Sequence, residues 1–400
     1  MSTPTIRSVR ASTTGGPAGT ASAGADYHDQ EAGHWIDDHI ASPMSGYPQY
    51  RESRQSFGLN VLGNLVVQIE ADSGQVGFAV STGGEIGAFI VERHLARFLE
   101  GSKVTDLELL WDQMYRSTLF YGRKGVVLNA ISAVDLALWD LLGKIRDEPV
   151  HAMIGGAVRD RQPFYATGAR PDAARRLGFV GGKMPLHHGP AEGTDGFAAN
   201  IEELAGVRAA VGDDFPLMWD CWMSLDLDYA VRLSHAAGEL GLRWIEEPLL
   251  PDDYWGYRDL RAAVPPGLQV TTGEHEATRW GFRLLLEMGC ADIIQPDVGW
   301  CGGLTELLKI SALADAQGAL VVPHGSSVYS YHFVMTRHHS PFAEFLMMAP
   351  GADEVTPMFH PLLLDEPVPV DGMLAIGQLG RPGFGVTLNP EIPLLRPYPR

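Results

Sequence analysis

The 400-residue chain is poor in cysteine, in long apolar runs and in basic residues. Its three cysteines, Cys221, Cys290 and Cys301, contain no C-x-x-C pair. That excludes a disulfide framework and favours reduced thiols in a cytoplasmic protein. No segment approaches about 18 uninterrupted apolar residues, so a membrane span is not expected. Basic residues number 30 against 49 acidic ones, a formal net charge of −19, which argues against nucleic acid as a partner and suits a small solute or a cation.

The overall amino-acid composition is typical of a globular protein with a sizeable core. Hydrophobic residues make up 45% and charged residues 20% of the chain, and its length allows two or three domains. Apolar and polar residues alternate over residues 65–82 on both sides of Ser73-Gly74, which predicts a β-hairpin with its turn there. Residues 127–144 carry apolar side chains at helical spacing and predict a helix closing at Gly143. The segment 15–55 shows no period and is either a functional lid or disordered.

A repeating pattern begins after Gln162. Short apolar segments alternate with stretches of helical periodicity, which predicts parallel strands connected by helices. Eight such strands indicate a closed barrel over about 160–349. We expect residues 1–150 to form a separate α+β domain, completed by the Pro- and Gly-rich residues 350–400. The predicted strands lie at 163–168, 178–186, 216–222, 242–248, 268–275, 291–298, 319–325 and 342–346.

Polar residues recur where one predicted strand after another ends. In a parallel barrel these positions meet on the C-terminal face, where barrel enzymes have their active sites. From the third strand to the eighth the residues are Asp220, Glu246 with Glu247, Glu274, Asp297, His324 and Glu344.

Three of these acids, Asp220, Glu246 and Glu274, follow successive strands. Carboxylates so close together would repel one another strongly unless a cation lay among them. Ligation by oxygen alone suits Mg²⁺. Each acid taken singly could instead cap the helix that follows it. The series favours a metal site.

The strings around these acids resemble a known family. "WDCW", "WIEEP" and "TTGEH" are similar to the metal-binding strand ends of the enolase superfamily, in its mandelate racemase-like branch. The resemblance implies Asp220, Glu246 and Glu274 as ligands of one Mg²⁺ per subunit. It also implies an α/β fold, a modified (β/α)7β TIM-type barrel with an α+β capping domain made from both termini.

Within that family the likeness narrows to acid-sugar dehydratases. It includes "DYHDQ", "SRQSFG", "GGKMP", "QPDVGWCGG", "VVPHGSSVYS" and "FAEFLM". It implies a hydro-lyase that takes a small sugar acid, with L-rhamnonate favoured over alternatives such as L-lyxonate or D-mannonate. It further implies a homo-oligomer, an octamer in similar enzymes.

The resemblance assigns the remaining roles. His324 would be the base that removes the C2 proton, oriented by Asp297, and Glu344 would contact the substrate and stabilise the transition state. His28 and Arg54 would bind substrate from the capping domain. Each histidine taken alone could equally be a core or loop residue.

Lys183 leaves several functions open. Other members of the superfamily have a Lys-x-Lys motif at the end of the second strand. The corresponding residues here are Lys183-Met184-Pro185, so the second lysine is missing, which disfavours a two-base epimerase. Lys183 itself could contact substrate, face the surface or be structural. The alternative that is not an enzyme is a non-catalytic protein that binds a sugar acid. The presence of both His324 and Asp297 argues against it, because a binding protein would need neither.

Overall fold

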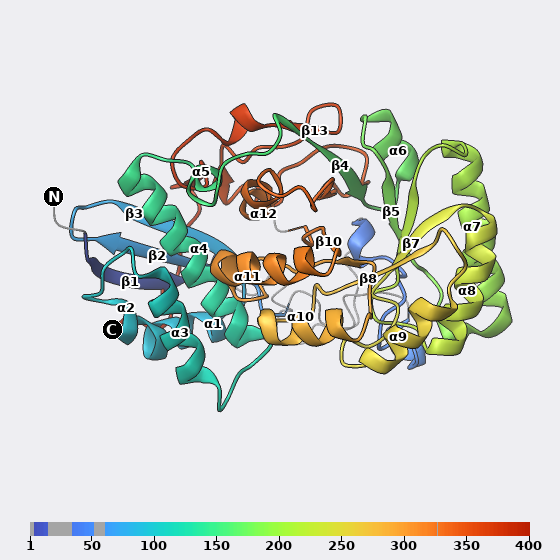
Figure 1. The fold of residues 1–400 in the computed structure, drawn as a ribbon, viewed down its shortest axis with the longest axis horizontal. Coiled ribbons are helices and arrows are strands. Elements are labelled where there is room, and N and C mark those ends of the chain that lie inside the picture. Colours follow the sequence, from blue (N-terminus) through green and yellow to red (C-terminus); the bar gives the residue numbers. More distant parts are fainter. Residues whose placement is uncertain (1–3, 15–33, 52–60, 326) are drawn as a thin grey trace.

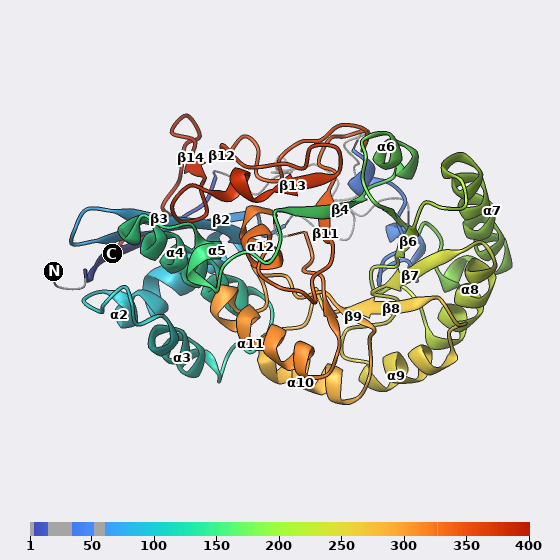
Figure 2. The ribbon, with the colours of Figure 1, turned by 45° about the horizontal axis from the view of Figure 1, so that its top comes forward.

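The protein consists of a barrel with a smaller α+β unit beside it (Figures 1 and 2). The computed structural model describes residues 4–14, 34–51, 61–325 and 327–400, and all structural statements concern these residues. The predicted fold class is confirmed, because a parallel curled sheet with helices outside it is capped by an antiparallel sheet.

The capping sheet contains three antiparallel strands in the order β1-β2-β3. These are β1 (Ile6–Ser12), β2 (Asn64–Ala71) and β3 (Val76–Thr82). The predicted hairpin is therefore correct. The turn between β2 and β3 contains Gly74, whose φ of 93° is a conformation that favours glycine.

Helices cover this sheet. They are α1 (Gly84–Ile90), α2 (Ala96–Leu99) and α4 (Val126–Arg146), with a π-helical turn at Val91–Leu95 between α1 and α2. Helix α3 (Leu107–Thr118) packs on α2 and α4. Of the helices described, α4 alone is long and apolar enough to cross a membrane, and 83% of that apolar window is buried. Its packing on β2 and β3 accounts for its apolar sequence.

The expected end of α4 at Gly143 is wrong. The helix continues to Arg146 and is closed by Asp147 in a left-handed conformation. Gly143 is required for close packing instead, because a Cβ there would come within 2.7 Å of the Gly383 backbone. The C-terminal segment thus lies directly on this helix.

The barrel sheet has nine strands, of which β13 (Met373–Ala375) is antiparallel and pairs with β4. The other eight are parallel, and all eight predicted strands are found among them. Their order is β10-β9-β8-β7-β6-β5-β4-β11. They are β4 (Arg161–Thr167), β5 (Gly182–Pro185), β6 (Leu217–Asp220), β7 (Leu242–Glu246), β8 (Gln269–Thr272), β9 (Ile293–Ile294), β10 (Leu320–Val321) and β11 (Ala343–Leu346).

One helix follows each of the first seven barrel strands, which gives the (β/α)7β pattern. They are α6 (Pro171–Arg176), α7 (Gly193–Val211), α8 (Leu227–Glu239), α9 (Tyr254–Ala263), α10 (Thr278–Glu287), α11 (Gly303–Ala316) and α12 (Ser327–Val334). A separate buried cluster is formed by Tyr165 in β4, Met218 in β6, Trp244 in β7, Ile293 in β9 and Val322 directly after β10. Layers of this kind fill barrel interiors.

The chain returns to the capping unit after the barrel. Short strands β12 (Leu363–Leu364), β13 (Met373–Ala375) and β14 (Thr387–Leu388) follow β11, and α5 (Val150–Met153) precedes β4. Thr13 pairs with Leu395, and Arg396 and Arg400 both pair with the buried Glu92. The end of the chain is thereby attached to the first sheet.

Candidate active site

The parallel sheet brings the predicted acids to one edge. Asp220 and Glu246 are the last residues of β6 and β7, and the register places them side by side. Glu274 lies two residues after β8, where the strand gives way to the loop before α10. Asp297 and His324 likewise lie three residues after β9 and β10. The C-terminal ends of adjacent strands therefore supply all five side chains.

His324 and Asp297 form the pair that the sequence predicts. His324 Nδ1 lies 2.8 Å from Asp297 Oδ2, and the amide of Gly299 donates to Asp297 Oδ1 at 2.6 Å. The carboxylate is thus held in place by its own loop. When Asp297 accepts from Nδ1–H, Nε2 is the nitrogen that can take a proton.

The surroundings of His324 favour its charged form in the absence of a bound cation. Burial opposes a charged imidazole, but Glu274, whose Oε2 lies 3.3 Å from His324 Nε2, and the bond with Asp297 outweigh it. The pKa of His324 is consequently raised well above its usual value. A cation bound to Glu274 would remove part of that attraction.

Lys183 occupies the centre of the acidic cluster. Its side chain has no exposure, and it forms ion pairs with Glu246, with Glu344 at 2.8 Å and with Asp220 at 3.5 Å. The surface-facing alternative for Lys183 is therefore wrong. Burial disfavours the ammonium, but the surrounding carboxylates raise the pKa of Lys183 well above its usual value.

Glu344 in β11 is held from three sides. Thr167 donates to its Oε1 at 2.5 Å and the Gly325 amide donates to its Oε2 at 2.7 Å, in addition to the ion pair with Lys183. Despite burial, the charges of Lys183 and His324 and the bond from Thr167 lower the pKa of Glu344 to about 2. Glu344 is thus an anion in a fixed orientation.

The two adjacent acids after β7 point to different partners. Glu246 pairs with Lys183 and accepts from Gln295 Nε2 at 2.6 Å. Glu247, with a φ of 46°, turns away to accept from Thr272 and from the Gly273 amide. The structure therefore separates the predicted ligand from its neighbour.

These side chains border a cavity of about 570 Å³ that lies between the barrel and the capping unit. It is lined by Asp220, Glu274, Lys183, His324 and Glu344, whereas Glu246, the ion-pair partner of Lys183, is fully buried. The capping unit supplies the opposite wall, in which Asn129 donates to Thr82 at 3.0 Å. The apolar lining of the whole cavity includes Trp35, Ile36, Ile40, Leu62, Leu346, Met348 and Met358.

The donor set fits a divalent cation. Asp220, Glu246 and Glu274 offer only carboxylate oxygens, the ligand type that Mg²⁺ prefers. Lys183 is the single buried ammonium among them, and burial still raises the pKa of Glu246 to about 8. Further positive charge is needed to keep all three acids ionised. The three are not gathered into a tight ligand set, since elsewhere in the described chain only His39, His188 and Glu192 bring such atoms within 4.8 Å of one another.

Two predicted substrate contacts, His28 and Arg54, lie outside the described residues. Their roles stay predictions. Conversely, the sequence did not single out Gln295, Trp222 or Trp300, which contact or line the same site. Gln295 lies in the string "IIQPDV" two residues before Asp297, and a polar side chain in so short an apolar strand was the available signal.

Fold and site together define an enzyme of the barrel class, with an acidic, histidine-containing C-terminal face beneath a capping domain. Residues 169–392 match the family model described as "Enolase C-terminal domain-like". Residues 60–155 match "Mandelate racemase / muconate lactonizing enzyme, N-terminal domain". The chain therefore belongs to the enolase superfamily, as its sequence predicted.

Comparison with solved structures identifies individual enzymes to which the chain is similar. A rhamnonate dehydratase from Gibberella zeae complexed with Mg is 48% identical, with a TM-score of 0.93 over 98% of this chain and 95% of that one. An L-rhamnonate dehydratase structure from the same organism is 46% identical, with a TM-score of 0.92 over 99% and 97%. The 3,6-anhydro-D-galactonate cycloisomerase of Zobellia galactanivorans is 26% identical, with a TM-score of 0.75 over 96% and 97%.

Proposed function

We propose that the protein is a Mg²⁺-dependent acid-sugar dehydratase that converts L-rhamnonate to 2-keto-3-deoxy-L-rhamnonate and water. Similarity over nearly the whole chain to rhamnonate dehydratase, one structure of which is complexed with Mg, supports the reaction and the cofactor. The observation that carries the proposal is the His324–Asp297 pair, in which His324 borders the same cavity as Asp220 and Glu274.

His324 moves the proton in this reaction. With Asp297 accepting from Nδ1–H, Nε2 takes the C2 proton, and the electron pair left behind moves into the carboxylate. A divalent cation held by Asp220, Glu246 and Glu274 supplies Lewis-acid stabilisation of that developing negative charge. The electrons then return to form the C2–C3 double bond as the 3-hydroxyl leaves. His324, now protonated, donates its proton to that hydroxyl, and the resulting enol tautomerises to the 2-keto acid.

Lys183 and Glu344 prepare the site for this chemistry. The ammonium of Lys183 fixes Glu344 and Glu246 and offsets part of their charge. Glu344 in turn accepts from Gly325, the residue that follows His324, so that the acid and the base are held by one short loop. Preorganised charge of this kind need not reorient during the reaction.

The apolar part of the cavity supports a deoxy sugar acid. L-Rhamnonate ends in a methyl group at C6, and Ile36, Ile40 and Leu346 are among the side chains that line the cavity. Such a wall can receive a methyl group but offers no hydrogen bond to a hydroxyl in the same place. The same reaction on L-lyxonate, which lacks C6, is the nearest alternative.

A single screen tests the proposal. The purified protein with Mg²⁺ is incubated with a library of sugar acids, and 2-keto acid formation is scored against the His324→Asn variant. L-Rhamnonate should give the highest kcat/KM, and the variant should give no product with any acid. Epimerised acid in place of a 2-keto product would contradict the dehydratase assignment, which Pro185 at the end of β5 also disfavours.

We also propose a cytoplasmic homo-oligomer, an octamer by family resemblance. All three cysteines are buried and unpaired, which suits a reducing compartment. Large apolar side chains are exposed on the capping unit and the barrel helices, among them Phe120 at 86%, Trp255 at 61% and Trp280 at 54%. Apolar side chains of this kind mark an association site where they form one contiguous patch. Light scattering after size exclusion would test the assembly, and a monomer would refute it.

A further inference from the structure

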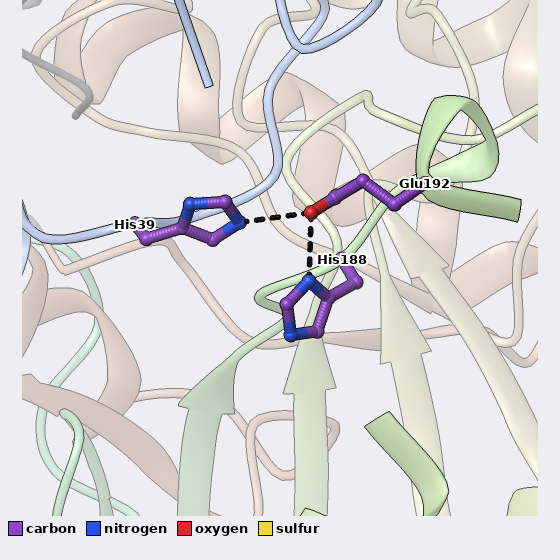
Figure 3. Close-up of side chains that lie close together, drawn as sticks. All are labelled: His39, His188 and Glu192. Atoms are coloured by element: carbon purple, nitrogen blue, oxygen red, sulfur yellow. Dashed lines mark hydrogen bonds and ion pairs between the residues drawn. The ribbon is translucent and has the colours of Figure 1, made fainter. Parts of the chain in front are cut away.

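Figure 3 shows a second cluster of ligand-type side chains, made of residues that do not line the catalytic cavity. His39 comes from the segment that precedes the capping hairpin, and His188 follows β5 of the barrel. Glu192 ends the 3₁₀ turn Pro190–Glu192 before α7. Both histidines point at one carboxylate oxygen, and neither the fold nor the proposed reaction requires this arrangement.

The distances fit a tetrahedral metal site. His188 Nδ1 lies 2.8 Å and His39 Nε2 3.2 Å from Glu192 Oε1, and all three atoms lie within 4.8 Å of one another. Zn²⁺ binds histidine nitrogen and carboxylate oxygen at about 2.0–2.2 Å, so its ligand atoms lie about 3.3–3.6 Å apart. An ion can therefore replace the two ring protons after movements of less than about 1 Å in the two bonded pairs.

Backbone contacts hold the ligands in position. Buried Asn200 accepts from the His188 amide at 3.0 Å and donates to its carbonyl at 2.7 Å. The Gly189 amide donates to Glu192 Oε2 at 2.9 Å, which leaves Oε1 facing the histidines. On the other side, the Ala41 amide donates to the Leu186 carbonyl at 2.9 Å. The site is thus supported on both segments, as metal ligands usually are.

Charge and access around the cluster also favour an ion. Asp38 and Glu203 line a solvent-accessible depression together with His39 and His188. The side chains of His39 and His188 are each 30% exposed, so an ion can reach the nitrogens from solvent.

We propose that His39, His188 and Glu192 bind one divalent transition-metal ion of the Zn²⁺ type, with water as a fourth ligand. Two imidazoles and one carboxylate form a nitrogen-rich set that suits Zn²⁺ and disfavours Mg²⁺. The ion joins the segment containing His39 to the β5–α7 loop. That segment also carries Trp35, Ile36 and Ile40, which line the catalytic cavity, so the ion stabilises one wall of it.

Zinc binding can be measured without any assay of turnover. Untagged, metal-stripped protein is dialysed to equilibrium against Zn²⁺ in excess Mg²⁺, which occupies the oxygen-only site. One Zn²⁺ per chain should remain bound, and it should persist in Glu274→Gln, a change in the catalytic cavity. His39→Asn and His188→Asn should each weaken Zn²⁺ binding by more than about 100-fold, because losing even an outer partner of a ligand costs about 10–100-fold.

A matched control is available beside the site. His187 adjoins His188 and lines the same depression, but its Nδ1 pairs with Glu203 at 2.8 Å instead of Glu192. His187→Asn should bind Zn²⁺ as the unaltered protein does, and Zn²⁺ should raise the Tm of both but not that of His39→Asn. No bound Zn²⁺ in excess Mg²⁺, or equal binding by His39→Asn and His188→Asn, would overturn the proposal. Loss of the ion in Glu274→Gln would assign it to the catalytic cavity and overturn it as well.

Discussion

Lys183 and Glu246 form an ion pair in which neither side chain is exposed to solvent. Lys183 belongs to β5 and Glu246 to β7, and they meet across β6, whose last residue Asp220 lies 3.5 Å from the same ammonium. A buried pair of this kind costs desolvation on both sides and is harmful when only one member is left. The protein thus supplies part of the charge compensation that a metal would complete.

Removing that ammonium should destabilise the metal-free protein. Lys183→Met leaves Glu246 and Glu344 buried without their cation, a loss of about 3–5 kcal/mol in the free energy of unfolding. Urea titration in excess chelator measures it, and Mg²⁺ should recover part of the loss. Arg116→Met is the control, because exposed Arg116 pairs with exposed Asp112 on the same helix and should change stability by less than about 1 kcal/mol. Equal effects would show that the buried network is not what stabilises β5.

Turnover should depend completely on a divalent metal. Asp220, Glu246 and Glu274 need a cation both to remain ionised together and to receive the substrate carboxylate. Exhaustive chelation should abolish 2-keto acid formation, and added Mg²⁺ should restore it. Full activity in the chelated protein would refute the assignment of these three acids.

His324→Asn should abolish both dehydration and exchange of the C2 proton with D₂O, while Mg²⁺ binding persists. General base catalysis contributes about 10²–10⁴-fold, so the loss should be at least of that size. Asp297→Asn should be milder, because it misorients a base that remains present. Continued C2 exchange in His324→Asn would identify another base. A large loss of folding stability in either variant would instead support a packing role for the pair.

Much of the barrel could be predicted because its strands are short, apolar and regularly separated by helices. The polar residue after each strand, such as Asp220 or His324, marked the edge at which the site lies. The orientation of Lys183 could not be predicted, since both faces of a barrel strand are buried and alternation does not separate them. His39 and His188 are far apart in the chain and share no periodic pattern. Their contact depends on how the segment before the hairpin lies against the β5–α7 loop, which only the fold determines.

The attachment of the chain end to the capping unit should weaken in acid. Burial opposes a charged Glu92, but bonds from Arg396, the Ala11 amide and Arg400 outweigh it and lower the pKa of Glu92 below its usual value. A lowered pKa contributes stability that is present above the unfolded-state pKa, near 4.5, and is lost as the pH falls through the folded-state value. Glu92→Gln should therefore cost about 1–3 kcal/mol at neutral pH, and this difference should shrink below about pH 4. Urea unfolding at several pH values tests this, and a difference that does not vary with pH would exclude the charge as the cause.

Substrate choice should follow the apolar wall of the cavity. The reacting end of the sugar acid is held by the metal site, His324 and Glu344, so the far end meets the capping unit. Ile40 is nearly fully buried and lines the cavity there. L-Lyxonate lacks the C6 methyl group of L-rhamnonate, and L-mannonate carries a hydroxyl on it, so the three acids differ only at that end.

A pocket that gains or loses one methyl or hydroxyl discriminates by about 1–3 kcal/mol, or roughly 10–200-fold. L-Rhamnonate should therefore have the highest kcat/KM, with measurable turnover of the other two. Ile40→Ala should narrow the gap between L-rhamnonate and L-mannonate, because it removes apolar contact that only the methyl group uses. Arg54→Ala should lower kcat/KM for all three without altering Mg²⁺ affinity. The substrate assignment would be refuted if L-rhamnonate were inert and an acid of opposite C2 or C3 configuration were turned over well. The site would then bind the opposite configuration at the reacting carbons.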